Sequence, residues 1–299
     1  MRASFLVAAL APWLVLAACR GTSEPVAELT VVPEEIELQL GSFTEISLLV
    51  RPLVDFQPAD VPQVFLHLID EPGSVLLTFD HVLPGEFRRG RDIAYSMRIY
   101  QSALSEPLAP GLYTLSAGLH DGGGGRFRLR TASPEIARLE YAVAKVRVPE
   151  PSTPLPGVRF SPSWLPVEPG RDRQILARRP LAGAGPGTFQ IGPLRGPGEI
   201  LLRLGLPLPG SGRLERLSEE MTPKIRLQSS CGAFQAELSG EAGADGIGVE
   251  ILIPVPATAA PVECDIELRP NFVVRTGDQA EARSINIEIL AWRAGARDE

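Results

Sequence analysis

Residues 63–81 read QVFLHLIDEPGSVLLTFDH, and this stretch decides the fold. Two short apolar runs flank the turn-forming sequence Glu71-Pro72-Gly73-Ser74. Pro and Gly suit the two central positions of a type II turn. Apolar runs on both sides of such a turn are typical of paired strands. The stretch therefore predicts a β-hairpin.

The same hairpin carries the candidates for a reactive or metal site, because it holds two of the chain's three histidines. If the strands pair symmetrically about Pro72-Gly73, His67 faces Thr78. Asp80 then lies diagonally on the side of His67 and can bond to it. His81 points to the opposite face, unless the register shifts by one residue. We interpret these groups as structural, with His67, Asp80 and His81 as the alternative catalytic or metal-binding set.

The rest of the chain also favours short strands. Pro and Gly number 29 each and divide the apolar sequence into short segments, while apolar residues at helical spacing are nearly absent. Apolar and polar residues alternate in residues 36–40, 93–100, 139–148 and 284–292. Many short strands between turn signals predict an all-β protein made of β-sandwiches.

The last of these alternating segments, SINIEILAW at residues 284–292, predicts the two faces of one strand. A period of two places the isoleucines at 285, 287 and 289 on one face. Asn286 and Glu288 take the other face. Trp292 shares the phase of this polar pair, so its ring is expected either to be exposed or to cover a contact between domains.

A proline-rich stretch divides the chain in two. Residues 149–156 read PEPSTPLP, which cannot enter the interior of a sheet and favours a stiff spacer. We therefore expect two tandem immunoglobulin-like or jelly-roll-like β-sandwich domains. The boundaries are residues 28–148 for the first domain, 149–157 for the linker, 158–293 for the second domain and 294–299 for a tail.

The N-terminus reads MRASFLVAALAPWLVLAAC. One basic residue precedes a short apolar run that ends in small residues, as in a secretory signal peptide. Leu16-Ala17-Ala18-Cys19 resembles the lipobox of bacterial lipoproteins. The resemblance implies that Cys19 is acylated and that residues 1–18 are removed, which leaves residues 19–27 as a lipidated tether. Two or three acyl chains would anchor the protein stably in a membrane.

Charge and the residue after the anchor bear on partners and location. The formal net charge of −7 excludes nucleic acid as an expected partner. The expected location is the extracytoplasmic face of the bacterial envelope. Arg20, which stands where some Gram-negative lipoproteins carry a retention aspartate, favours the outer membrane if the source is Gram-negative.

Two cysteines remain once Cys19 is assigned to lipid. Cys231 and Cys264 both lie in strand-like sequence, and the envelope permits oxidation. We expect a disulfide between two strands of the second domain. The alternative is two separate buried thiols. Metal binding is not expected at these cysteines, because they lack CxxC spacing and no histidine lies in this half of the chain.

A longer pattern connects the hairpin to residues 110–121. VFLHLIDEPGSVLLTFDH, followed by APGLYTLSAGLHDGGGG, resembles an extracytoplasmic immunoglobulin-like module found with bacterial envelope and glycosyltransferase-type membrane proteins. The resemblance implies the fold and no established activity. His120 replaces the module's usual tyrosine. The matching residues are His67, Asp70, Asp80, His81, Pro110, Gly111, Tyr113, Leu115, Gly118, Leu119 and Asp121.

Nucleophile and phosphate-binding motifs are missing from the sequence, so no cofactor is expected. Trp164 and Trp292 are the candidate ligand contacts, because sugars stack on exposed aromatic rings. The leading hypothesis is a non-enzymatic, membrane-anchored scaffold that binds another envelope protein. The alternative is a glycan-binding module. A hydrolase or metal-dependent enzyme that uses His67, Asp80 and His81 is the third.

Overall fold

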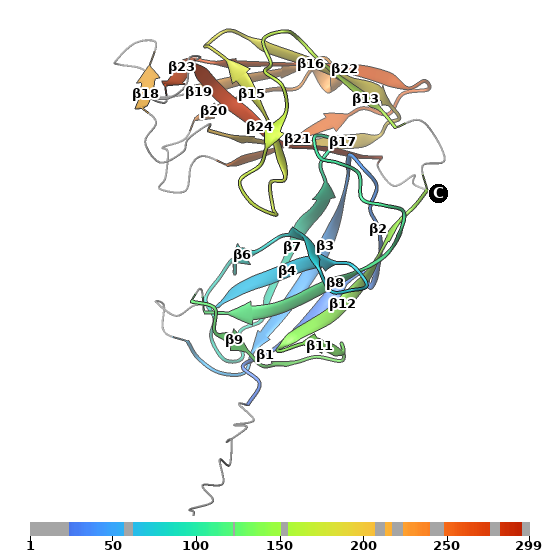
Figure 1. The fold of residues 1–299 in the computed structure, drawn as a ribbon, viewed down its shortest axis with the longest axis vertical. Helices are drawn as coiled ribbons and strands as arrows, with labels where there is room; N and C mark the ends of the chain where they lie inside the picture. Colours follow the sequence, from blue (N-terminus) through green and yellow to red (C-terminus); the bar gives the residue numbers. More distant parts are fainter. Residues whose placement is uncertain are drawn as a thin grey trace, which may run out of the picture.

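The computed structural model describes residues 24–56, 62–121, 123–150, 155–206, 213–216, 224–239, 248–275 and 282–294. Strands make up nearly all the regular structure of these ranges, which also contain a short 3₁₀ turn at Cys231–Ala233. The predicted all-β class is therefore confirmed (Figure 1). None of the described segments forms a helix that is both long and apolar enough to span a bilayer.

The first half of the chain packs two layers of strands around one apolar core. One layer has the order β10-β1-β3-β7, and the other has the order β11-β12-β8-β4-β5. Leu29 and Leu48 of the first layer meet Leu66 and Leu115 of the second. The strands are β1 (Ala27–Val32), β2 (Glu35–Glu37), β3 (Ser42–Pro52), β4 (Gln63–Ile69), β5 (Val75–Thr78), β6 (His81–Val82), β7 (Ile93–Gln101), β8 (Gly111–His120), β9 (Arg126–Phe127), β10 (Leu129–Arg130), β11 (Glu135–Ala137) and β12 (Glu140–Val148).

The second half has its own apolar core between the sheet β13-β16-β22-β19-β20 and the strands β14, β15, β24, β17 and β21. Phe189 and Ile266 of the first sheet contribute to this core, as do Leu202 and Ile287 of the second. The strands are β13 (Gly157–Phe160), β14 (Glu168–Pro169), β15 (Ala177–Ala182), β16 (Gly187–Leu194), β17 (Gly198–Gly205), β18 (Arg213–Arg216), β19 (Lys224–Ser229), β20 (Gln235–Ser239), β21 (Val249–Val255), β22 (Val262–Pro270), β23 (Phe272–Arg275) and β24 (Arg283–Ala294).

The two halves are joined by backbone pairing. β24 meets β3 in a parallel bridge at Trp292 and Ser42, so that one eleven-stranded sheet runs through both halves. The Ala103 N–H also donates to the Leu290 carbonyl oxygen at 2.7 Å. The presence of two apolar cores supports a division into two tandem sandwich domains. The shared sheet does not separate the two halves, so this division remains an interpretation.

A bulge in β24 overturns the predicted faces of residues 284–292. Arg203 of β17 pairs with Ile289, whereas its neighbour Leu204 pairs with Ile287, which leaves Glu288 as the extra residue. The bulge shifts the phase of the strand. Ile287 packs in the core of the second half, but Ile289 packs in the core of the first half. Trp292 packs against the core of the second half and pairs with Ser42 of the first half, so its ring lies at the contact between the halves, one of the two places expected for it.

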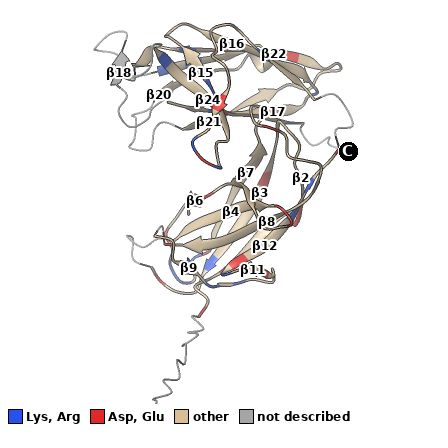
Figure 2. Ribbon diagram, in the orientation of Figure 1, with Lys and Arg blue, Asp and Glu red and all other residues tan. Residues whose placement is uncertain are grey.

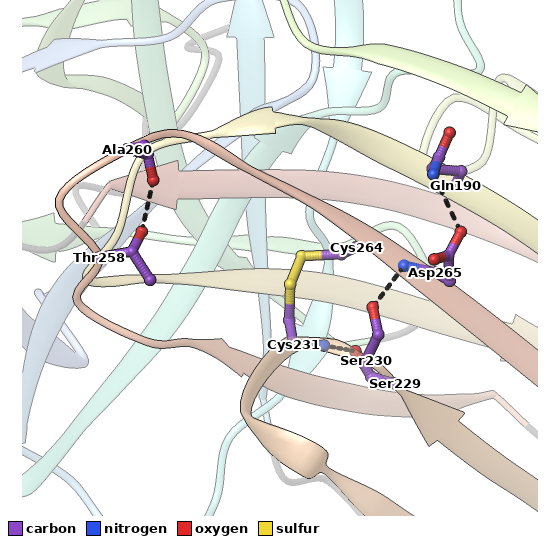
Figure 3. The surroundings of a disulfide bond; sticks show 8 residues. All are labelled: Gln190, Ser229, Ser230, Cys231, Thr258, Ala260, Cys264 and Asp265. Atoms are coloured by element: carbon purple, nitrogen blue, oxygen red, sulfur yellow. Dashed lines mark hydrogen bonds between the residues drawn. A yellow bond between two sulfur atoms is a disulfide. The ribbon is translucent and has the colours of Figure 1, made fainter.

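The predicted disulfide is confirmed (Figure 3). Cys264 lies in β22, and Cys231 lies in the 3₁₀ turn directly after β19, which pairs with β22. The bridge therefore joins a strand to a turn instead of two strands. Ser230 fixes this turn, because its backbone N–H donates to the Asp265 carbonyl oxygen and its hydroxyl accepts the Asp265 N–H at 2.8 Å. The two Cα atoms lie 5.2 Å apart.

Candidate functional site

The hairpin forms with the predicted register, because β4 pairs antiparallel with β5 and His67 lies opposite Thr78. The turn begins one residue earlier than expected. The Gly73 N–H donates to the Asp70 carbonyl oxygen at 3.0 Å, and Gly73 adopts φ +89°. The Asp70 carboxylate accepts the Ser74 N–H at 2.6 Å, which closes the turn.

Three strands and a loop bring a charged cluster together around His67. Its Nε2 lies 3.4 Å from Oδ1 of Asp80, as the register predicts, and its Nδ1 lies 3.5 Å from Oε1 of Glu140 on β12. Ser116 on β8 donates to the same Glu140 oxygen at 2.6 Å, and Arg126 donates to the other at 2.8 Å. Glu140, Ser116 and Arg126 could not be predicted from the sequence, because long-range strand pairing alone brings them to His67. We call these five residues the His67 cluster.

Electrostatics keep the His67 cluster charged. Burial by itself lowers the pKa of His67, but Asp80 and Glu140 together outweigh this effect and raise the pKa to about 9. His67, assisted by Ser116 and Arg126 and opposed by burial, lowers the pKa of Glu140 to about 2. At neutral pH the imidazole therefore carries a proton and the carboxylate does not. A protonated His67 cannot act as a general base.

Aromatic packing covers the His67 cluster. The guanidinium of Arg126 lies 4.4 Å from the centre of the Phe65 ring. Phe65 in turn lies against Gly118 on the neighbouring strand β8, where a Cβ atom would approach the ring to 2.2 Å. The side chain of Glu140 is only 9% exposed and that of His67 only 14% exposed. Gly118 thus makes room for the Phe65 ring on which Arg126 packs, whereas Asp80 at the rim of the cluster is 45% exposed.

His120 helps to lower the pKa of Asp80, whereas His81 makes its hydrogen bonds outside the cluster. His81 lies opposite Val64, which packs in the core. Its Nδ1 lies 2.8 Å from the Phe79 carbonyl oxygen, so Nδ1 carries the hydrogen, and Nε2 accepts from the Tyr95 hydroxyl at 2.6 Å. Burial lowers the pKa of His81, which favours this neutral form. Among the described residues, no group of three or more His, Cys, Asp and Glu side chains could hold a metal ion.

The remaining polar residues of the module pattern serve the turns of the first half. Asp121 accepts the N–H groups of Gly123 and Gly125 at 2.9 and 2.8 Å, which closes the glycine-rich turn after β8. The Tyr113 hydroxyl donates to the Ala109 carbonyl oxygen at 2.7 Å, at the start of the same strand. Asp121 and Tyr113 therefore hold backbone at the two ends of β8.

The two tryptophans have different surroundings. Trp164 is 4% exposed, and its indole N–H donates to the Thr188 carbonyl oxygen at 3.1 Å. Trp292 is half-buried and lies on Gly41, where a Cβ atom would approach the ring to 2.2 Å. Trp292 also lines an open groove of about 730 Å³ between the two halves. The groove is further lined by Leu155, Pro156, Pro193, Arg195, Glu199 and Pro261.

The contact between the halves is a second site, and apart from the expected place of Trp292 the sequence did not reveal its residues. Phe43 and Tyr100, which are paired on β3 and β7, share the core of the first half with Leu201, Ile289 and Ala291 of β17 and β24. The phase change at Glu288 is what turns Ile289 and Ala291 toward this contact. We call these five residues the junction.

Ion pairs flank the junction on two sides. Arg293 lies 2.7 Å from Glu199 of its own half and 3.4 Å from Glu45 of the first half. On the other flank, Arg98 of β7 lies 3.7 Å from Glu250 of β21. Figure 2 shows acidic residues on β3 and β24, near the place where the two halves meet. Partly exposed pairs of this kind each contribute up to about 1 kcal/mol.

No protein-family model matches the chain, and no curated protein matches it significantly. The resemblance to the envelope module therefore remains a prediction from the sequence pattern. Cys19 and the signal peptide lie outside the described residues, so lipidation also remains a prediction.

Proposed function

We propose that the protein is a lipid-anchored component of the bacterial cell envelope that acts without catalysis, as a scaffold for another envelope protein. In this proposal, Cys19 holds the chain at the membrane, outer rather than inner if the source is Gram-negative. Two immunoglobulin-like or jelly-roll-like domains then extend from the anchor. The lipobox-like sequence supports the anchor, and the packing at the junction supports the scaffold.

The junction carries the argument for a scaffold. Its aromatic and aliphatic residues are shared between the halves, and ion pairs to Glu45 and Glu250 flank them. Shared burial of this kind fixes the relative orientation of two bodies better than a linker does. A scaffold needs such a fixed spacing between its two halves. A reaction needs reactive side chains, whereas His67 is paired with Asp80 and Glu140 of its own half.

In-cell crosslinking of the native lipidated protein, followed by purification and identification of what it binds, tests the proposal. The chain with Cys19→Ala serves as the unanchored control. We expect a defined envelope protein to be recovered with the wild-type chain and to be lost with the control. Recovery of polysaccharide without any protein would contradict the scaffold.

A second candidate function, glycan binding, is favoured by the position of Trp292 in the groove. An indole beside Arg195 and Glu199 combines a stacking face with polar groups, which is how proteins bind sugars. Titration of the protein with envelope polysaccharide should change the fluorescence of wild-type protein and not that of Trp292→Phe. Trp164 provides the internal reference because it is buried. An unchanged spectrum in the wild type would dismiss this candidate.

A further inference from the structure

Residues 170–176 connect β14 to β15 as a compact loop, which extends from the second half toward the first half (Figure 1). The Gly170 N–H donates to the Leu176 carbonyl oxygen at 2.7 Å, which closes the loop. A side chain at Gly170 would collide with the Ile175 carbonyl oxygen, 1.4 Å from the Cβ position. The Asp172 carboxylate accepts the N–H groups of Gln174 and Ile175 at 2.8 and 2.9 Å. We call this loop the strap.

The strap covers the free edge of β5. Strand β5 ends its sheet and pairs only with β4 among the described strands. On its open side, the Thr78 N–H donates to the Arg173 carbonyl oxygen at 3.2 Å, and the Arg173 guanidinium donates to the Val75 carbonyl oxygen. The single residue Arg173 therefore occupies two positions that a neighbouring strand would otherwise bond. An exposed strand edge is a template for pairing with another chain, so its coverage has a consequence for binding.

The strap is tied to the second half through a buried carboxylate. Arg171 donates to Glu288, with 3.0 Å between Nη2 and Oε1, and the side chain of Glu288 is only 1% exposed. The bulge in β24 places Glu288 here, and Gly205 makes room for it, because a Cβ atom at Gly205 would lie 2.1 Å from Oε1. Arg203 lies on the same carboxylate at 3.5 Å.

We propose that residues 170–176 form a releasable strap, whose closed position depends on the ion pair between Arg171 and buried Glu288, and whose release uncovers the edge of β5. Release leaves the Thr78 N–H and the Val75 carbonyl without their partner Arg173. This inference does not depend on the proposed scaffold function, because it concerns an opening of the fold itself.

Two opposing effects set the pKa of Glu288. Burial raises the pKa of Glu288, although Arg171, Arg203 and Arg178 act against it. Opening the strap changes both effects, so substitution of Arg171 or Glu288, and not a change of pH, is the direct test of the ion pair. The groups that face Glu288 are Arg171 and Asp172 of the strap, Arg178 of β15, Arg203 of β17 with its neighbour Glu250 of β21, and Tyr100 of β7.

Site-resolved amide hydrogen exchange of the full lipidated chain in detergent tests the strap. The Thr78 amide reports the strap, and the adjacent Phe79 amide, which donates to the Leu66 carbonyl oxygen at 2.7 Å, reports the hairpin itself. The test variants are Arg171→Ala and Glu288→Gln. The matched control is Glu237→Gln, which removes a carboxylate paired with Lys224 and Arg226 far from the strap.

We expect exchange at Thr78 to become about tenfold faster in both test variants, with no change at Phe79 and no change in the control. Wild-type exchange at Thr78 in both variants would overturn the proposal. Equal acceleration at Thr78 and Phe79 would also overturn it, because the hairpin and not the strap would then have opened.

Discussion

The indole ring of Trp292 lies on the backbone of Gly41, and this contact joins the last strand of the chain to the first half. The backbone N–H of Trp292 donates to the Gly41 carbonyl oxygen at 2.8 Å. Gly41 adopts φ +71°, and the place of its missing Cβ atom is 2.2 Å from the ring. The orientation of the two halves thus depends on a glycine that has both a left-handed backbone and no side chain.

Replacement of Gly41 by alanine is expected to lower the free energy of unfolding by roughly 2–4 kcal/mol, from left-handed strain plus overpacking. Chemical denaturation monitored by tryptophan fluorescence measures it. Gly90→Ala is the matched control, because Gly90 has a similar φ of +76° and nothing within 4 Å of its Cβ position. Equal losses in the two variants would show that Trp292 does not press on Gly41.

The His67 cluster predicts a loss of stability at alkaline pH. The pKa of His67 is raised from 6.5 to about 9 in the folded state. Its stabilising contribution is therefore complete below pH 6.5 and disappears as the pH rises to about 9. We expect the free energy of unfolding to fall by up to about 3 kcal/mol across this range.

Denaturation at a series of pH values measures this effect, with His67→Gln as the control that lacks the titrating group. The variant should be less stable than the wild type near pH 6.5 and should not show the decline. A decline of the same size in His67→Gln would assign the titration to a different residue.

Glu140 predicts the opposite dependence in acid. Its pKa is lowered from 4.5 to about 2, so its contribution is present above pH 4.5 and disappears as the pH falls to about 2. In Glu140→Gln, the free energy of unfolding should fall less steeply as the pH is lowered from 4.5 to about 2, and His67 should keep Asp80 as its paired carboxylate. An acid limb identical to that of the wild type would contradict the role of Glu140.

The disulfide predicts a stability that depends on the redox state. Cys231 and Cys264 are 33 residues apart, and closing a loop of that length stabilises a fold by roughly 3–4 kcal/mol in the chain-entropy model. Thermal unfolding with a reductant should therefore show a lower midpoint. The double variant Cys231→Ala and Cys264→Ala should not respond to the reductant, and the wild type should resemble it once reduced.

Lipidation predicts the distribution of the protein between cell fractions. Wild-type protein is expected in the membrane fraction and in the detergent phase, because two or three acyl chains anchor a protein stably. Cys19→Ala should be recovered as an unacylated chain without this association. Cys19→Ala protein that stays in the membrane fraction to the same extent would show that another feature holds the protein there.

Local residue chemistry determined the class of the fold and the geometry of the hairpin. Pro72-Gly73 and the apolar runs on both sides of it were sufficient to predict strands, the pairing of His67 with Thr78 and the approach of Asp80, because a hairpin depends on neighbours in sequence. The same kind of reasoning placed the turn one residue too late. The pairing of Cys231 with Cys264 was predicted from their number and from the compartment expected for the protein.

Tertiary structure alone decided the partners of those local elements. Glu140 reaches His67 because β12, β8 and β4 are adjacent in one sheet, although 73 residues separate the two in the sequence. The bulge at Glu288 depends on the pairing of β24 with β17, and it reverses the faces that a period of two predicts. Strand alternation is a local property, whereas a bulge, a buried carboxylate and the contact of Trp292 with Gly41 exist only once distant strands have packed together.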